Sequence, residues 1–388
     1  MPSFYEFFAG GGMVRAGLGQ EWSCHFSNDF DHKKGQTYCA NWGSKELKTA
    51  DIGSLTTNDL TDEADLAWAS FPCQDLSLAG GGAGLKGDRS GTFWPFWKLM
   101  NGLIKENRAP RLIVLENVCG TLTSHGGKDF ATICNGFQQA NYSVGALVID
   151  AALFVPHSRP RLFIIGVRQD VMVPEELKVE EPISPWHTST LRAAYEKLAL
   201  RTKQSWIWWN LPLPPKRTKC LEDLIEENPN TSWFSADETS QLLDMMSAIN
   251  RAKVEKAQRL KYRVVGAIYK RTRPDEKGHK VQRAEVRFDG ISGCLRTPAG
   301  GSSRQLILIV EGRSVKARLI SSRETARLMG LPEDYALPEN YNEAYHLTGD
   351  GVVVPVVRHL TKHIFEPILK EDLQGTTLLH ECHSMFAG

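Results

Sequence analysis

The chain of 388 residues lacks the features of an exported, disulfide-bonded or membrane-spanning protein. Its 8 cysteines are scattered and form no C-x-x-C pair, which argues against a disulfide framework and against a four-cysteine zinc site. No apolar run approaches the roughly 18 residues of a membrane span. The N-terminal MPSFYEFFAGGG has no basic region followed by an apolar stretch, as a signal peptide has. We therefore expect a cytoplasmic protein with reduced thiols and no membrane contact.

A strong net charge is also absent. The formal charge is +1, so no overall field attracts the chain to nucleic acid. The exception is segment 251–290, which contains 13 Lys and Arg against 5 Asp and Glu. A charge run is usually a solvated helix face, but Tyr262 and Tyr269 are interleaved with these charges. That combination favours a surface that faces phosphates.

The first 170 residues alternate short apolar runs with helix-like segments. This order predicts an α/β fold with a doubly wound, mostly parallel sheet. Such a sheet binds ligands beyond the carboxyl ends of its strands. The expected strands are 4–8, 23–27, 66–71, 111–115, 144–149 and 161–167, and the expected helices are 31–41, 92–106 and 128–139.

The composition changes from about Val171. Prolines become frequent, and Trp206, Trp208 and Trp209 lie close together. Pro-rich connections are typical of loops between folded parts, so we expect a second, smaller domain that ends near Gly290. The remaining chain contains a helical segment, SSRETARLMGLPEDY, and then TGDGVVV, which we interpret as a glycine turn that opens an apolar helix.

A glycine cluster, FFAGGGMVRAGLG at 7–19, directly follows the first expected strand. Its spacing is not that of a phosphate loop and does not match the dinucleotide fingerprint cleanly. The cluster alone is therefore compatible with a tight turn or with a nucleotide-like ligand. The second strand ends at Asp29, whose carboxylate would hold ribose hydroxyls or cap the next helix. Phe30 would lie against an adenine, and Asp51 with Ile52 forms a second polar and apolar pair.

Cys73 lies between the apolar run WASFP and a glycine-rich stretch that extends to Gly91. A cysteine is usually buried, but this one stands at the carboxyl end of an expected strand, behind the rigid Pro72. The thiolate is the nucleophilic form of cysteine, and the glycines would let residues 76–92 close over a substrate. We interpret Cys73 as a nucleophile and the other cysteines as structural.

Two further strand ends carry polar residues. RLIVLENVCG places Glu116 and Asn117 after four apolar residues, and a carboxylate in that position is either paired or functional. VPHSRPRLFIIGVR places Arg159 and Arg161 before the last expected strand. These arginines are either surface charges or guanidinium groups aimed at carbonyl or phosphate oxygens in a pocket.

The ordered set FAGGG, SNDFD, DI, PCQ, ENV, RPR, SSRETARLMGLPEDY and TGDGVVV resembles the bacterial DNA (cytosine-5) methyltransferases. The match covers 1–170 and about 290–370. The unmatched interval lies where that family keeps its target recognition domain. The resemblance implies a Rossmann-like methyltransferase fold with a catalytic and cofactor-binding domain at 1–175, target recognition at 176–290, a return segment at 291–370 and a tail at 371–388.

The resemblance also implies roles for individual residues. Cys73 would add to the cytosine, Glu116 would bond its ring nitrogen 3 and amine, Arg161 would contact its carbonyl oxygen, and Arg159 and Asn117 would support them. The residues expected around S-adenosylmethionine are Phe8, Ala9, Gly10, Gly12, Asn28, Asp29, Phe30, Asp51, Ile52, Pro72, Asp350, Gly351 and Val352. The residues expected to contact DNA are Gln74, Ser77, Arg89, Arg296, Ser302, Ser303 and Arg304.

Two positions depart from the commoner family pattern, namely His157, where glutamine is usual, and Asp350, where asparagine is usual. The expected substrate is double-stranded DNA whose target cytosine is flipped out of the helix. We expect a monomer. We also expect a cognate restriction endonuclease that acts on the same DNA sequence. The tail HECHSM fits a disordered end better than a metal site.

Three other functions remain open from the sequence. A tRNA cytosine methyltransferase would use the same scaffold, although the insert of more than a hundred residues favours duplex DNA. A DNA-binding relative without activity would not need every chemical residue. A nicotinamide oxidoreductase would need the glycine turn and the acidic residue after the second strand, but not the set of Cys73, Glu116 and Arg161.

Overall fold

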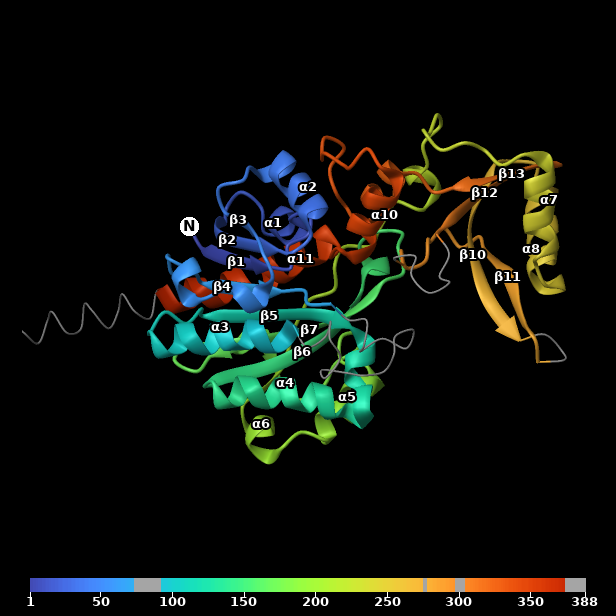
Figure 1. Ribbon diagram of the computed structural model, residues 1–388. Helices are drawn as coiled ribbons and strands as arrows, with labels where there is room; N and C mark the ends of the chain where they lie inside the picture. The colour runs from blue at the N-terminus through green and yellow to red at the C-terminus, as the bar shows by residue number, and fades with distance from the viewer. Residues whose placement is uncertain (73–91, 275–277, 297–303, 374–388) are drawn as a thin grey trace, which may run out of the picture. The chain divides into compact units, whose positions relative to one another are not determined.

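The computed structural model describes residues 1–72, 92–274, 278–296 and 304–373, and the chain forms two compact units (Figure 1). Among the described residues, the larger unit comprises those within 1–150, 160–214 and 356–373, and the smaller comprises those within 151–159 and 215–355. These units differ from the expected domains at three places. Residues 151–159, expected in the first domain, fold with the smaller unit. Residues 176–214 fold with the larger unit, and residues 291–355 fold with the smaller one.

The larger unit is built on a sheet that has nine strands in the described part of the chain, in the order β3-β2-β1-β4-β5-β7-β6-β9-β8. Strands β1 to β5 pair in parallel, whereas β7 runs antiparallel to both of its neighbours, β5 and β6. The predicted α/β class with a mostly parallel sheet is thereby confirmed. The strands are β1 (Ser3–Phe7), β2 (Ser23–Asp29), β3 (Leu47–Thr49), β4 (Leu66–Ala69), β5 (Leu112–Val118), β6 (Tyr142–Asp150), β7 (Pro160–Arg168), β8 (Lys178–Val179) and β9 (Trp206–Trp209).

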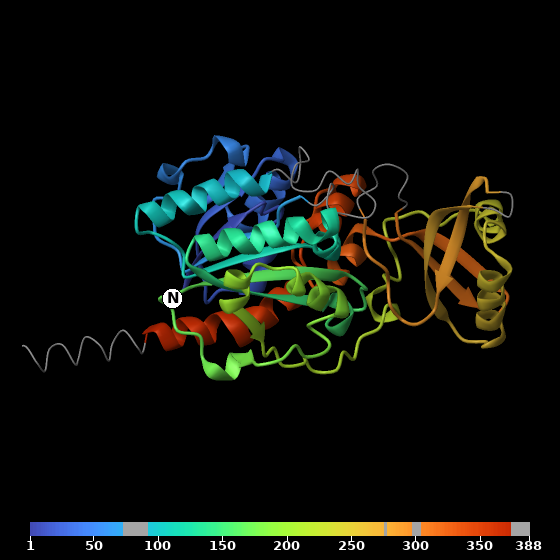
Figure 2. The ribbon, with the colours of Figure 1, turned by 90° about the horizontal axis from the view of Figure 1, so that it is seen from below.

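Helices cover both faces of this sheet because its strands are apolar on both sides. On one face, Phe96 and Phe137 join a core with residues of β1, β4 and β6, and Figures 1 and 2 show α3 and α4 lying along the sheet. On the other, Trp68 meets Phe365 edge to face at 6.2 Å. The helices are α1 (Met13–Leu18), α2 (His32–Trp42), α3 (Phe93–Lys105), α4 (Lys128–Gln139), α5 (Ser189–Glu196), α6 (Leu200–Gln204) and α11 (Val354–Leu360), which continues as a π-helix (Thr361–Phe365). The expected strands and helices of the first 170 residues are confirmed, with ends that differ by a few residues.

The smaller unit contains an antiparallel sheet in the order β11-β10-β12-β13. Val254 of α8 packs against Ile268, Ala284 and Leu308 on one face of that sheet. The basic segment 251–290 thus contains α8 and a hairpin. The elements are α7 (Ala236–Asp244), α8 (Ala248–Arg259), β10 (Val264–Pro274), β11 (Lys280–Arg287), β12 (Leu306–Glu311), β13 (Ser314–Leu319), α9 (Ser322–Leu328) and α10 (Tyr341–Asp350).

The expected helix in SSRETARLMGLPEDY is α9. Its first turn is closed by a capping box, in which the Ser321 hydroxyl and the Glu324 carboxylate each bond the other's backbone N–H. The glycine turn differs from the prediction, because Gly349 and Asp350 form the last turn of α10. Residues 351–353 then connect α10 to α11.

Among the described residues, six cysteines form no disulfide, namely Cys24, Cys39, Cys119, Cys134, Cys220 and Cys294. Cys73 and the HECHSM tail lie outside the described residues. Within the ranges that the structure describes, no helix has the length and apolar character needed to cross a membrane.

Candidate active site

The carboxyl ends of β1, β2, β4 and β5 meet at one edge of the larger sheet. The register pairs Phe7 with Asn28 and with Ala69, and pairs Ala69 with Leu115. Because β7 is antiparallel, its beginning lies at the same edge, where Arg161 pairs with Val118. The topology therefore brings the expected residues of five strands to one edge.

The glycine turn after β1 adopts left-handed backbone conformations at Phe8 (φ 58°), Gly10 (φ 55°) and Gly12 (φ 77°). Gly12 also has no room for a side chain, because a Cβ would lie 2.3 Å from Nε1 of Trp42. At Gly10, no heavy atom lies within 4 Å of the position of a Cβ. The backbone at Gly10 is thus open on one side, as close approach of a ligand requires.

Asp29 closes the turn from β2. Its Oδ2 accepts a hydrogen bond from the Gly10 N–H at 2.8 Å, and its Oδ1 accepts one from the Asp31 N–H at 2.9 Å. Burial raises the pKa of this carboxyl above its ordinary value. The helix-cap interpretation of Asp29 is wrong, because Asp31 caps α2 by accepting from the Lys33 N–H. The role at ribose hydroxyls stays a prediction.

The other residues expected around the cofactor differ in how far their side chains are exposed to solvent. Phe30 is 65% exposed and presents its ring beyond the end of β2. Asn28 is buried and donates from its amide to the carbonyls of Lys48 and Ala50, at 2.9 Å each. Asp51 accepts from the Gly53 N–H at 2.6 Å, and Ile52 and Ala9 are buried. Asn28 and Asp51 therefore shape the backbone of this edge, whereas Phe30 offers an uncovered surface.

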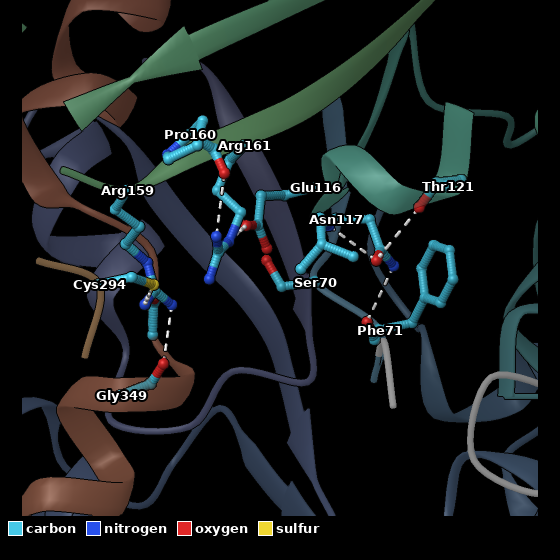
Figure 3. A network of polar contacts seen from close by, with 12 residues as sticks. Ser70, Phe71, Glu116, Asn117, Thr121, Arg159, Pro160, Arg161, Cys294 and Gly349 are labelled. Carbon is cyan, nitrogen blue, oxygen red and sulfur yellow. Dashed lines mark hydrogen bonds and ion pairs between the residues drawn. The ribbon is translucent and has the colours of Figure 1, made fainter. Parts of the chain in front are cut away.

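Glu116 and Arg161 form an ion pair, with 3.2 Å between Oε1 of the glutamate and Nε of the arginine (Figure 3). Their side chains are only 8% and 16% exposed. Arg161 also donates from Nη1 to the Pro160 carbonyl at 2.9 Å. Because a charge with so little contact with water needs a partner, each of these side chains fixes the position of the other.

Asn117 links β5 to the chain that leads to Cys73. Its Nδ2 donates to the Phe71 carbonyl at 3.2 Å, and its Oδ1 accepts from the Val118 N–H at 2.8 Å (Figure 3). Phe71 itself is buried, and Pro72 is half-buried. Cys73, Gln74, Ser77 and Arg89 lie outside the described residues. The last described residues before the cysteine are therefore held by the Asn117 amide.

Arg159 belongs to the smaller unit and is 2% exposed. Its Nη2 donates to the Gly349 carbonyl at 2.8 Å (Figure 3). Nη2 also donates to the Gly351 carbonyl at 2.8 Å, and Nη1 donates to the Leu295 carbonyl at 3.2 Å. The guanidinium group thus holds the connection that follows α10. At that connection Val352 is buried, and Asp350 is exposed.

His157 and the expected DNA contacts also lie in the smaller unit. His157 is fully buried, and its Nε2 accepts from the Leu295 N–H at 3.1 Å, so the imidazole fixes residue 295 beside Arg159. Arg296 is exposed. The guanidinium of Arg304 stacks over the Tyr341 ring at 5.7 Å and donates to Asn342, and Ser302 and Ser303 lie outside the described residues.

Two residues beside the glycine turn were not predicted from the sequence. Trp42, at the end of α2, donates from Nε1 to the Gly11 carbonyl at 2.9 Å. Glu6 lies buried in β1, accepts from the Val14 N–H at 3.2 Å, and has its pKa raised to about 8 by burial. The sequence contained a signal for Glu6, because it is an acidic residue inside the otherwise apolar run FYEFF. Nothing local in the sequence links Trp42 to a turn thirty residues earlier.

Comparison with known proteins gives a consistent result. The family model of the C-5 cytosine-specific DNA methylases matches residues 3–366. The type II methyltransferase M.BsuFI of Bacillus subtilis is 26% identical over 377 residues, which cover 96% of this chain and 74% of that protein. M.NgoBI of Neisseria gonorrhoeae is 25% identical over 362 residues, covering 92% of this chain and 91% of that protein.

Two solved structures share the fold. The Dnmt2 methyltransferase of S. pombe superimposes with a TM-score of 0.56 at 18% identity, over 95% of this chain and 99% of its own. The Entamoeba histolytica methyltransferase EhMeth superimposes with a TM-score of 0.62 at 14% identity. The superposition covers 94% of this chain and 98% of that protein. Because the family model matches nearly the whole sequence, this chain belongs to the C-5 cytosine-specific DNA methylase family.

Proposed function

We propose that the protein methylates carbon 5 of a flipped-out cytosine in a specific duplex DNA sequence, through a temporary bond between Cys73 and carbon 6. The observation that carries the proposal is the buried ion pair of Glu116 and Arg161. It lies at the edge of the sheet that also carries the glycine turn and the chain leading to Cys73. These are the groups that addition to a pyrimidine ring requires.

S-adenosylmethionine is the proposed methyl donor, and the glycine turn fits it. The backbone at Gly10 is open to a ligand, Phe30 offers an uncovered ring for an adenine, and the Asp29 carboxylate is bonded to the Gly10 N–H. When bound, this cofactor supplies an electrophilic methyl group on a sulfonium sulfur. The Asn28 and Asp51 contacts would hold the neighbouring backbone in shape. Asp350, Gly351 and Val352 remain predicted cofactor residues in the smaller unit.

Cys73 supplies the nucleophile in this proposal. Carbon 5 of cytosine is a weak nucleophile, but addition of the thiolate to carbon 6 converts the ring into an enamine whose carbon 5 is electron-rich. After carbon 5 is methylated, a base such as water removes its proton, and the electron pair of that C–H bond forms the double bond between carbons 5 and 6 that restores the aromatic ring. The carbon–sulfur bond breaks at the same time, and its electron pair leaves with the sulfur. The thiolate leaves unchanged. Pro72 and the Asn117 contact to Phe71 would fix the direction from which the sulfur approaches.

Glu116 and Arg161 would stabilise the charge that develops on the ring. In its protonated form the Glu116 carboxyl donates to ring nitrogen 3 and accepts from the exocyclic amine, and the Arg161 guanidinium donates to oxygen 2. Because the two side chains already hold each other, they need little reorganisation during the reaction, and preorganised donors are the most effective ones. A base stacked in a duplex cannot present carbon 6 to a thiol, so the cytosine must leave the helix first.

The biological setting follows from the substrate and the relatives. Several relatives are type II methyltransferases, so we expect a restriction-modification pair in which a cognate endonuclease acts on the same sequence. We also expect a monomer that works in the cytoplasm.

Methyl transfer from tritiated S-adenosylmethionine tests this function. The protein is incubated with a mixed pool of duplex DNA and, separately, with transfer RNA, and methylated positions are located by bisulfite sequencing. The proposal predicts 5-methylcytosine in one DNA sequence context and none after Cys73→Ser. Methylation of tRNA alone would establish the tRNA enzyme, and DNA binding without methylation would establish a relative without activity.

A further inference from the structure

The β10–β11 hairpin of the smaller unit has one face that α8 does not cover. Side chains alternate along each strand, and Ile268, Ala284 and Val286 point into the core with α8. The intervening residues therefore point to the opposite side. We call this set the hairpin face, and its described members are Ala267, Tyr269, Arg271, Val281, Arg283, Glu285 and Arg287. Ala267, at the base of the hairpin, is buried, and the charged residues lie toward the hairpin end.

The hairpin face has more positive than negative charge, and its arginines differ in their partners. Nε of Arg271 lies 3.5 Å from Oε2 of Glu285, and Nε of Arg287 lies 2.7 Å from Oδ1 of Asp289. In the described part of the chain, the side chain of Arg283 makes neither a hydrogen bond nor an ion pair. Two of the three guanidinium groups are thus paired, and Arg283 keeps its donors available.

The position of Arg283 is unfavourable in the free protein. The register places it directly opposite Arg271 on the neighbouring strand. Side chains so placed have Cβ atoms roughly 4.5–5.5 Å apart, and like charges at that distance destabilise a sheet. An acceptor that binds both guanidinium groups would remove this repulsion.

The neighbours of Arg271 hold it in place. The Tyr269 ring lies under its guanidinium group, with 5.3 Å from Cζ to the ring centroid. The ring itself is packed so closely against Gly293 that a Cβ there would lie 1.2 Å from the phenolic oxygen. Tyr269 and Glu285 therefore fix Arg271, and Arg283 stands beside this fixed group with free donors.

We infer that the hairpin face enters the major groove of the substrate DNA and that Arg283 reads a guanine of the target sequence. The inference rests on the proposed function. A two-stranded antiparallel ribbon fits the major groove of B-form DNA, where guanine presents two acceptors, O6 and N7, that match the fork of an arginine. The major groove of A-form RNA is too deep and narrow for this contact.

The test compares Arg283→Ala, Arg283→Lys and a matched control, Arg313→Ala. Arg313 is an exposed arginine in the turn between β12 and β13 of the same sheet. A random duplex DNA pool is selected by binding to each full-length protein, and the same pool is methylated and sequenced. Folding of each variant is checked by circular dichroism.

We expect Arg283→Ala to lose preference for guanine at one position by about 5- to 150-fold, which corresponds to the loss of one bidentate pair. Arg283→Lys should keep overall affinity and lose most of that preference, and Arg313→Ala should keep it. Unchanged preference in Arg283→Ala overturns the inference, as does a uniform loss of affinity for all sequences. A wild-type protein that selects a DNA sequence but methylates nothing would refute the proposed function instead.

Discussion

Glu116 and Arg161 meet because β7 runs antiparallel to β5. The end of one strand lies beside the beginning of the other, so two residues 45 positions apart (161 minus 116) form an ion pair of 3.2 Å at the edge of the sheet. A parallel β7 would have sent the arginine to the far edge. The reversal of this one strand therefore places the Arg161 guanidinium beside the one carboxylate of β5. The proposed reaction uses these two side chains together.

Removal of the guanidinium group should slow the chemical step. We expect Arg161→Ala to lower kcat by about 10²- to 10³-fold, the usual effect of losing one preorganised donor to a developing negative charge. Arg168→Ala is the matched control, because Arg168 lies at the other end of β7 and pairs with Asp170 at 2.6 Å. Steady-state methylation of the identified DNA sequence measures both variants, and equal kcat values for them would contradict the role of Arg161.

Asn117 should act by positioning the chain before the nucleophile. Asn117→Asp keeps the shape but replaces the N–H that donates to the Phe71 carbonyl with an acceptor. We expect single-turnover methyl transfer to slow about tenfold or more, with S-adenosylmethionine affinity unchanged. In the control, Asn210→Asp, the lost donor bonds the Glu176 carbonyl at 2.9 Å and follows β9, which lies three strands from β5 in the sheet. A loss of cofactor affinity in Asn117→Asp, with normal turnover, would reject the positioning role.

Trp42 should stabilise the glycine turn that is proposed to bind the cofactor. Trp42→Phe removes the N–H that donates to the Gly11 carbonyl, a hydrogen bond of about 1 kcal/mol. We expect the Kd for S-adenosylmethionine to rise about fivefold in isothermal titration calorimetry. Trp22→Phe, which loses a bond to Glu366 at 3.2 Å, should leave the Kd unchanged. Equal Kd values for both variants and the wild type would show that the turn holds its shape without this bond.

Glu6 should make stability depend on pH. Burial raises its pKa to about 8 from 4.5, so the folded protein keeps a proton that the unfolded chain releases. The contribution of Glu6 to the free energy of unfolding should therefore be fully present below pH 4.5. It should fall as pH rises toward about 8, by up to about 1.4 kcal/mol per pH unit. Glu6→Gln cannot ionise, so its advantage over the wild type should grow across this range in urea unfolding. Parallel stability profiles would mean that Glu6 does not titrate there.

The sequence was sufficient to predict the elements that form the site edge. The apolar run LIVL before Glu116 located the carboxyl-terminal part of β5, because burial on both faces of a parallel sheet requires continuous apolar strands. The polar residues Asn28 and Asp29 marked the end of β2. The direction of β7 was not predictable in this way. Strand orientation depends on which neighbours pair, and an apolar run such as that after Arg161 reads the same in both directions.

Contacts between distant segments were also beyond local sequence patterns. The tryptophans near Trp206 indicated a separate domain, but β9 instead extends the large sheet by pairing with β6. The positive charge of segment 251–290 was evident from the sequence. Only the strand register shows that Arg283 lies opposite Arg271. Likewise, the Asn117 amide was expected to support catalysis, and its partner, the Phe71 carbonyl, emerged only from the fold.

The most direct test of the proposed mechanism is to trap the covalent bond between Cys73 and cytosine. Duplex DNA with 5-fluorocytosine at the target position is incubated with S-adenosylmethionine and the protein. Fluorine cannot leave carbon 5 as a cation in the way that a proton does, so the sulfur cannot be eliminated afterwards. We expect a DNA–protein adduct on a denaturing gel with the wild type and none with Cys73→Ser. An adduct with both proteins, or none with a wild type that methylates ordinary DNA, would contradict it.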